Sequence, residues 1–552
     1  MATLSLSRVT RLFAALAIAA TALTVSAQSA DPFAAGPNES ALGGKLVLVL
    51  PFDNRSGQPN LNWISESFTD TLDQRLRSSG FLTITRDDRL FALDHLGLPL
   101  NFKPSRATTL RIAQTLDADF VIVGSFTLNN NRISAQAQVL EVNKLQLSNP
   151  LDDSAELPRL LDLENGVAYK VARQIDPHFP VAQQTFLAAS SAIKLDAFES
   201  YIRGVDAPTS AERIKRLQAA VAGTNKYPQA LLALGKAQFL DRQFDAAATT
   251  LAQIPQSDPL ALEAGFYIGL AKFNSAKYAD AENAFGFVST RLPLPEVVNN
   301  QGVAAARQGK DGAALFQRAT ATDPQDPDYH FNLAVALYRR GDIAGARNEV
   351  QQTIKLHASD TEAPQLLAAI NSGQPAPPVP RPGAAAPGTR TSNAYEPLER
   401  IRRTYSEAGF RQAAFQLDQV RAMRLSTLPP SEQAAQFSQL GRDYLSQGLV
   451  LEAERQFQAA VNIQPTSAIG HAGLAQVRER SGDPGEARKE AQLSLQYSGN
   501  VTAYLVLARL DLNTNQLAAA ASDVSNALRL EPANAAALGL KQALASRGQS
   551  LP

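Results

Sequence analysis

The chain has 552 residues, 45% of them hydrophobic and 19% charged, a composition typical of folded protein and a length that suits several domains. Its 52 basic and 52 acidic residues cancel, which removes any global electrostatic reason to expect nucleic acid or an anionic membrane as partner. The absence of cysteine excludes disulfides, thiol catalysis and a lipid anchor on a cysteine.

Residues 1–27 have the pattern of a cleavable signal peptide. Arg8 and Arg11 precede the apolar run Leu12–Val25, which is too short to span a membrane and ends in small residues that suit cleavage. Residues 28–44 are small and polar and predict a flexible leader. We therefore expect a periplasmic or secreted protein without a lipobox cysteine and without an integral membrane span.

Residues 45–180 predict an α/β domain. In order, the expected elements are a strand at 45–51, a helix at 62–78, a strand at 81–85, a helix at 107–116, strands at 119–126 and 132–139, and a helix at 155–175. That order predicts a mixed sheet covered by helices. Asp87-Asp88 and Asp152-Asp153 fall in expected loops, where we interpret them as solvated turn residues.

Three stretches of this domain carry a resemblance to a known family. They are LVLPFDNRSG, the helix from Phe68 to Leu76, and LDADFVIVGSF followed by RISAQAQVLE. They resemble the amino-terminal domain of TolB and its FlgO- and CsgG-like relatives among envelope-assembly and peptidoglycan-synthase-activating proteins. The resemblance implies a non-enzymatic docking domain that works in a bacterial envelope.

Residues 195–371 predict helices alone, arranged in repeats. Gly235, Ala247, Leu251 and Pro259 recur 34 residues later as Gly269, Ala281, Phe285 and Pro293. Two further units follow, around Gly302 and Ala334, the third being shortened by about two residues. These units form the expected first array.

Residues 372–393 are rich in proline and alanine and predict a linker, because they lack large apolar side chains to bury. Residues 394–550 predict a second array that begins with a divergent repeat and ends in a capping helix. Its clearest unit carries large and small packing residues at fixed positions: Leu440, Gly441, Tyr444, Gly448, Ala453, Phe457, Ala460 and Pro465. That unit resembles the tetratricopeptide repeat family, which implies antiparallel helix pairs stacked into a superhelix.

No catalytic motif is recognisable. The sequence lacks a P-loop, GxGxxG, GxSxG or HExxH pattern, and none of its five histidines has another within metal-ligand spacing. We therefore predict that the protein is not an enzyme and uses no cofactor or metal.

The candidate partner-binding residues lie on the first helix of each repeat, which in this repeat family lines the concave groove. At position 12 of this helix, three repeats of the first array carry an aromatic side chain: Phe239, Phe273 and Tyr338. They could form a trough for an apolar or extended peptide, or they could pack between repeats. In the second array, Arg442, Gln476, Arg480, Arg509 and Asn513 could hold a carboxylate or an acidic peptide, or they could form an ordinary solvated face.

The sequence thus predicts an α+β domain followed by a tetratricopeptide superhelix in two arrays. The leading hypothesis is an exported scaffold whose grooves bind proteins or peptides of the bacterial envelope. The alternative is a regulatory activator that acts on an envelope enzyme or assembly machine through the N-terminal domain.

Overall fold

The computed structural model describes residues 46–99, 105–188, 193–224, 227–373, 376, 397–403 and 407–552. The expected signal peptide (1–27), the leader (28–44) and nearly all of the linker (372–393) lie outside the described residues. Within the described part, the chain forms two compact units. One contains the first helical array and the segment Pro397–Arg403, and the other contains the α/β domain and the second array.

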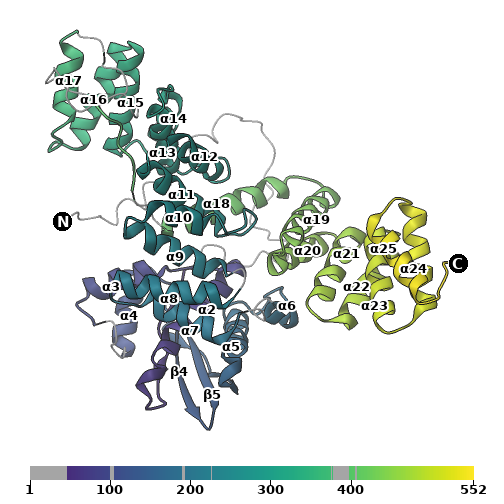
Figure 1. Cartoon of the computed structure of the whole chain (residues 1–552). Coiled ribbons are helices and arrows are strands. Elements are labelled where there is room, and N and C mark those ends of the chain that lie inside the picture. Colours follow the sequence, from purple (N-terminus) through teal and green to yellow (C-terminus); the bar gives the residue numbers. More distant parts are fainter. Residues whose placement is uncertain are drawn as a thin grey trace, which may run out of the picture. The chain divides into compact units, whose positions relative to one another are not determined.

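The α/β domain comes first in the chain (Figure 1). Its strands are β1 (Leu46–Val49), β2 (Asp53–Asn54), β3 (Leu82–Thr83), β4 (Phe120–Asn129), β5 (Arg132–Glu141), β6 (Gln146–Leu147) and β7 (Leu151–Glu156). Its helices are η3 (Pro59–Leu61), α2 (Trp63–Ser78), α3 (Arg86–His95), α4 (Arg106–Thr115), η4 (Leu157–Arg159), α5 (Leu160–Ile175) and α6 (Gln183–Ala188).

The sheet is mixed, as expected. β1 pairs in parallel with β3 and β4, and β4 pairs antiparallel with β5 through a turn at Asn130 and Asn131, both of which have positive φ. β5 also pairs antiparallel with β6 and β7. On one face, apolar residues of β1, β4 and β5 pack against α3 and α4. α2 and α5 contact each other, and α5 contacts β5 and β7.

Two expectations for this domain are wrong in detail. Asp87 and Asp88 lie in the first turn of α3 rather than in a loop, because the Thr85 hydroxyl caps this helix by accepting from the backbone N–H of Asp88. Acidic residues are favourable at a helix amino terminus. Asp152 and Asp153 lie on β7, which occupies the start of the expected helix at 155–175, so that helix begins only at Leu160.

Among the described residues, the first array consists of four helix pairs, preceded by the single helix α8 and followed by the single helix α17. Its elements are α8 (Ser210–Gly223), α9 (Pro228–Leu240), α10 (Phe244–Leu251), α11 (Ala261–Asn274), α12 (Tyr278–Ser289), α13 (Pro295–Ala306), α14 (Ala313–Thr322), α15 (Pro327–Arg340), α16 (Ile343–Leu356) and α17 (Ala363–Asn371). The helix before them, α7 (Leu195–Val205), packs against α2 instead, with the Phe198 ring 6.3 Å from that of Trp63.

The second array follows the same plan. A single 20-residue helix, α18 (Glu407–Ser426), stands where the divergent first repeat was expected. The pairs that follow are α19 (Pro430–Ser446) with α20 (Val450–Ile463), α21 (Ala468–Arg480) with α22 (Pro484–Tyr497), and α23 (Val501–Asn513) with α24 (Leu517–Leu530). The closing helix α25 (Ala535–Ser546) contacts α23 and α24 and buries Ala537 and Leu544.

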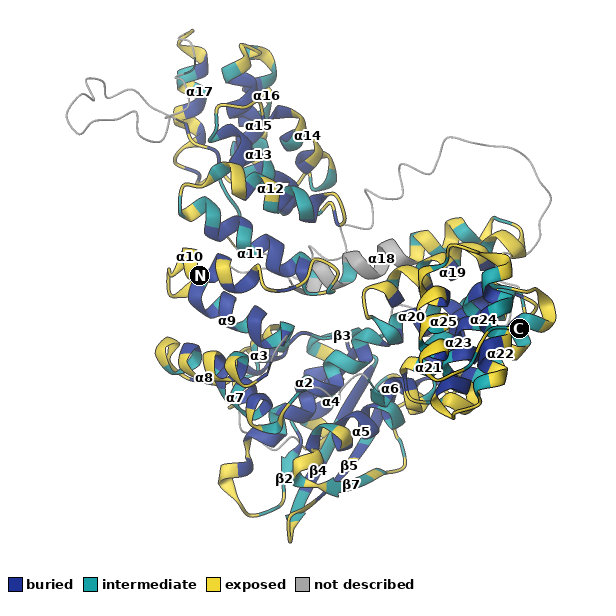
Figure 2. Cartoon of the chain, turned by 45° about the vertical axis from the view of Figure 1, so that its right-hand side comes forward, coloured by how far each residue is buried: buried dark blue, intermediate teal, exposed yellow. Residues whose placement is uncertain are grey.

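Small residues set the distance between paired helices. A Cβ atom on Gly441 would lie 2.7 Å from the ring of Phe457, so only glycine lets α19 approach α20 this closely. Gly448 has a φ of +81° in the turn between these helices. Buried residues gather on the facing sides of the paired helices, and exposed residues lie on their outer sides and in the turns (Figure 2). Within the described residues, no helix is both long and apolar enough to cross a membrane.

A candidate peptide-binding groove in the first repeat array

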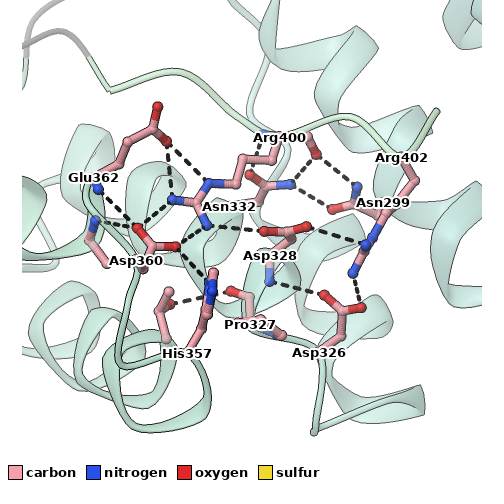
Figure 3. Close-up of polar contacts among 12 residues, drawn as sticks. Asn299, Asp326, Pro327, Asp328, Asn332, His357, Asp360, Glu362, Arg400 and Arg402 are labelled. Atoms are coloured by element: carbon pink, nitrogen blue, oxygen red, sulfur yellow. Dashed lines mark hydrogen bonds and ion pairs between the residues drawn. The ribbon is translucent and has the colours of Figure 1, made fainter. Parts of the chain in front are cut away.

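The segment Pro397–Arg403 lies in the first array, although the sequence suggested that residues from 394 onward belong to the second. It has no helix or strand of its own, and it contacts side chains of α13 and α15 (Figure 3). The array thus holds a stretch of its own chain as it would hold a bound peptide. The residues that contact this segment are called the groove below.

Asparagine side chains bind the backbone of the segment. The amide of Asn332 on α15 accepts from the backbone N–H of Arg400 at 2.6 Å and donates to its carbonyl at 2.8 Å. Asn300 on α13 makes the same pair of bonds with Arg402, both at 2.8 Å. Alternate residues of an extended chain present their N–H and C=O groups to the same side, so two amides suffice to hold an edge of the segment.

A third asparagine ties the two repeats together. Asn299 donates to the carbonyl of Arg400 at 3.1 Å, and its own oxygen accepts from Asn332 at 2.7 Å. Asn299, Asn300 and Asn332 are all fully buried. A buried amide without partners is costly, so these three side chains are satisfied by one another and by the segment.

Arg400 reaches a group of acidic residues. Its guanidinium makes two bonds to Asp360, at 2.6 and 2.9 Å, and one bond to Asp328 at 3.0 Å. Glu362 accepts from the same guanidinium at 3.1 and 3.3 Å. The guanidinium also lies over the ring of Phe331, 3.7 Å from its centre, so that it combines ion pairs with a cation–π contact.

Arg402 contacts the adjacent end of this acidic group. It forms an ion pair with Asp326, and a second nitrogen lies 3.4 Å from Asp328. Asp326 also caps α15 by accepting from the backbone N–H of Asp328 at 2.9 Å. The position of Asp326 is therefore fixed by its capping hydrogen bond to α15 as well as by its ion pair with Arg402.

The acidic residue of the segment meets basic residues of the groove. Glu399 is buried and forms an ion pair with Arg339, and Arg307 lies 3.8 Å from its second oxygen. Arg307 also donates to the carbonyl of Glu399 at 3.0 Å, and Arg339 donates to that of Pro397 at 2.8 Å. The groove thus has a basic end and an acidic end.

Burial and ion pairing act in opposite directions on Asp360. Burial alone would raise the pKa of its carboxyl, but the hydrogen bonds and charge of Arg400, with the backbone N–H groups of Ala363 and Glu362, lower that pKa to about 2. Asp360 therefore stays ionised throughout the physiological range, and Arg400, whose pKa is raised in turn, stays protonated.

The predicted aromatic residues lie beside this groove. Phe239 and Phe273 are half-buried and pack against the same apolar cluster as Ile401 of the segment. The Phe239 ring lies 5.7 Å from that of Tyr267, and the Phe273 ring lies 5.2 Å from that of Tyr278. Tyr338 is buried, and its hydroxyl donates to the carbonyl of Ala369 at 3.3 Å. All three side chains make contacts within the array.

The predicted residues of the second array differ in their surroundings. Arg509 forms two bonds to Glu479, at 2.6 and 2.5 Å, and Arg480 donates to the carbonyl of Leu445 at 2.7 Å. Arg442 and Asn513 are exposed, and Gln476 is half-buried. Part of the positive charge in this group is therefore paired within the array.

Sequence reasoning missed the asparagines and acids of the groove, although a signal for them exists. Asn300 and Asn332 occupy the same place in successive repeats, 32 residues apart, and so do Arg307 and Arg339. Only the aromatic residues at position 12 were selected as groove residues in the first array. Comparing the first helices of the third and fourth repeats at every position would have found both pairs.

Among the described residues, no group of three or more histidine, cysteine, aspartate or glutamate side chains could hold a metal ion. The largest gathering of carboxylates in the groove is instead paired with Arg400 and Arg402. The arrangement suits recognition of a peptide.

Comparison with protein families agrees with the repeat architecture. The family model described as "Tetratricopeptide repeat" matches residues 310–364 and 438–500, one range in each array. The chain contains tetratricopeptide repeats. Repeats of this kind are typically non-catalytic and bind peptides or proteins. No curated protein matches the sequence.

Several solved structures are similar to parts of the chain. The "LpoB C-terminal domain from Salmonella enterica" is 20% identical, covering 21% of this chain and 87% of that one, with a TM-score of 0.19. MamA from residue 41 to its end, from Desulfovibrio magneticus RS-1, is 19% identical, covering 31% of this chain and 99% of that one, with a TM-score of 0.29. A tetratricopeptide repeat protein from Parabacteroides merdae is 11% identical, covering 61% and 98%, with a TM-score of 0.22. The resemblance of residues 45–180 to TolB amino-terminal domains stays a prediction.

Proposed function

We propose that this chain is an exported, non-enzymatic scaffold of the bacterial cell envelope whose first array binds an extended segment of a partner protein. The observation that carries the proposal is the occupancy of the groove by Pro397–Arg403, held through its backbone by Asn300 and Asn332. Backbone recognition suits any extended chain, and the neighbouring side-chain contacts supply specificity.

The expected export supports a partner in the envelope. Residues 1–27 carry the signal-peptide pattern, and an array exported with them would meet proteins of that compartment. Within this proposal, the α/β domain is a docking module of the kind that the TolB-like sequence resemblance implies. The second array would offer a further surface, and two binding surfaces on one chain can raise avidity.

Site-specific photo-crosslinking in the exporting bacterium tests this proposal. A photoreactive phenylalanine analogue would replace Phe273, which lies beside the groove, or Leu240, which is exposed at the end of α9 and serves as the control position. We expect a defined crosslinked partner from position 273 that disappears when Asn300 and Asn332 are both changed to alanine.

Two results would contradict the proposal. One is a crosslink at position 273 that survives the double alanine change, since binding would then be independent of the backbone-reading amides. The other is a partner captured only by residues 45–180, which would favour an activator acting through the α/β domain. Circular dichroism of the double variant must show that its helices are retained.

A further inference from the structure

We propose that the groove selects partner peptides in which a glutamate is followed by two arginines at alternate positions, and that Pro397–Arg403 competes with them from within the chain. The inference rests on the proposed function and adds the chemistry of the ligand. The evidence is the complementarity between the sequence Glu399-Arg400-Ile401-Arg402 and the two ends of the groove. Figure 3 shows the acidic end.

The acidic end selects arginine at two positions. Asp360 binds both terminal nitrogens of Arg400, an arrangement that a lysine ammonium cannot reproduce. At the amino-terminal end of α15, Asp326 pairs with one terminal nitrogen of Arg402, and Asp328 lies 3.4 Å from the other. The ring of Phe331 adds a flat surface that suits a guanidinium.

The basic end fixes the direction in which a peptide binds. Arg307 and Arg339 enclose the carboxylate of Glu399, directly before the first arginine. A peptide bound in the reverse direction would bring its arginines to these two arginines and its glutamate to the acidic residues. Like charges in a desolvated site are unfavourable, so the groove has a polarity.

The position between the two arginines is apolar. Ile401 packs against the apolar clusters that also contact Phe273. The asparagine amides fix the register, because Asn332 and Asn300 hold the backbone of residues 400 and 402 and leave the side chain between them to face this apolar surface. The recognised pattern is therefore Glu-Arg-apolar-Arg in an extended conformation.

The chain's own segment has this pattern, so it must be displaced before a partner can bind. It is joined to the end of α17 by residues 372–396. A tether of such length gives an effective concentration on the order of 1 mM. A free peptide whose intrinsic Kd is about 10 μM would then bind the intact chain on the order of 100-fold more weakly.

A fluorescent peptide with the sequence of residues 396–403, EPLERIRR, is the probe. Its binding to the full chain would be measured by fluorescence anisotropy and compared with binding to the variant Arg400→Ala/Arg402→Ala. Arg403→Ala is the matched control, because Arg403 is an exposed arginine of the same segment. We expect the double variant to bind the probe at least tenfold more tightly than the wild type, and the control to bind like the wild type.

The proposal that Pro397–Arg403 competes with partner peptides is overturned if the double variant binds the probe no more tightly than the wild type while its helical circular dichroism is unchanged. If alanine at both positions unfolds the array, probe binding to the wild type is compared instead with binding to Arg400→Lys/Arg402→Lys, in which both positive charges are retained. Sedimentation velocity tests whether the segment in the groove comes from a second copy of the chain. A wild-type dimer that becomes monomeric in the double variant would overturn competition within one chain.

A display library of eight-residue peptides, selected on Arg400→Ala/Arg402→Ala, separates this inference from the proposed function. Enrichment of Glu-Arg-apolar-Arg peptides, lost when Asp328 and Asp360 are both changed to asparagine, supports the inference. Enrichment of unrelated peptides whose binding still requires Asn332 overturns the Glu-Arg-apolar-Arg pattern but supports the proposed function of the groove in peptide binding. No enrichment on a folded variant overturns both.

Discussion

At the scale of single residues, the groove depends on three side-chain amides. Asn300 and Asn332 each hold the N–H and C=O of one residue of the segment, and Asn299 connects the two repeats. Because each amide serves one residue, the two ends of the segment should respond separately when one amide is removed.

Hydrogen exchange measured at single residues would check this. Asn332→Ala leaves the N–H of Arg400 without its acceptor, so we expect that amide to exchange faster, by roughly 5- to 150-fold for a loss of about 1–3 kcal/mol. Asn300→Ala should do the same to Arg402. The exposed Asn513 provides the control, Asn513→Ala. Equal acceleration of both amides in either variant would mean that the segment leaves as one piece.

Residue identity also limits what the sequence alone could predict. Phe457 and Gly441 predict a helix hairpin, because a large and a small residue at that spacing commonly pack two antiparallel helices against each other. Asn332 by itself does not indicate a binding role, since a polar residue on a helix is ordinarily solvated. Its role depends on Arg400, which is 68 residues away in the chain, and no local pattern encodes that contact.

At the scale of elements, a histidine joins consecutive helices in both arrays. His330 lies between the carboxylate of Glu349 at 2.6 Å and the carbonyl of Pro324 at 3.1 Å. His471 repeats the arrangement with Glu490 at 2.6 Å and Pro465 at 2.9 Å. These two histidines thus make defined polar contacts between helices.

The hydrogen bond and charge of Glu490 and the carbonyl of Pro465 raise the pKa of His471, against the opposing effect of burial. Protonated histidine donates to both acceptors, whereas the neutral ring donates to one. The stabilisation is therefore complete below pH 6.5, the ordinary pKa of histidine, and is lost as pH rises through the raised value.

Urea unfolding of wild type and His471→Gln at several pH values would measure this effect. We expect the wild type to lose about 1–3 kcal/mol of unfolding free energy between pH 5.5 and 8, the cost of leaving a buried acceptor unpaired, beyond what the variant loses. The exposed His95 on α3 gives the control, His95→Gln. Parallel pH profiles for wild type and His471→Gln would refute the role assigned to this contact.

The order of the elements was largely predictable, whereas their ends were not. The alternation of Ile133, Ala135 and Ala137 predicted β5 correctly, because a strand with one buried face leaves that pattern. Strand β7 was missed because its sequence, LDDSAE, is mostly polar, and only pairing with β5 makes it a strand. Tertiary pairing decided the structure there.

At the scale of the whole molecule, the two units should unfold separately. In stacked helical repeats each repeat contacts only the repeats next to it. A destabilising change therefore spreads along one array rather than through the whole chain. The only tryptophan of the sequence, Trp63, is buried in α2 of the α/β domain. Its fluorescence reports on that unit alone, whereas far-ultraviolet circular dichroism reports on the helices of both.

Phe316→Ala tests this independence. Phe316 is fully buried in the first array, where it packs closely against Gly302, so its truncation should cost about 3–5 kcal/mol. We expect part of the circular dichroism transition in urea to move to lower concentration while the midpoint of Trp63 fluorescence stays in place. Leu72→Ala in α2 is the matched core substitution of the other unit, and it should move the fluorescence midpoint. If Phe316→Ala shifts both signals together, the two units unfold as one cooperative body, and a ligand that binds the groove would then stabilise the α/β domain as well.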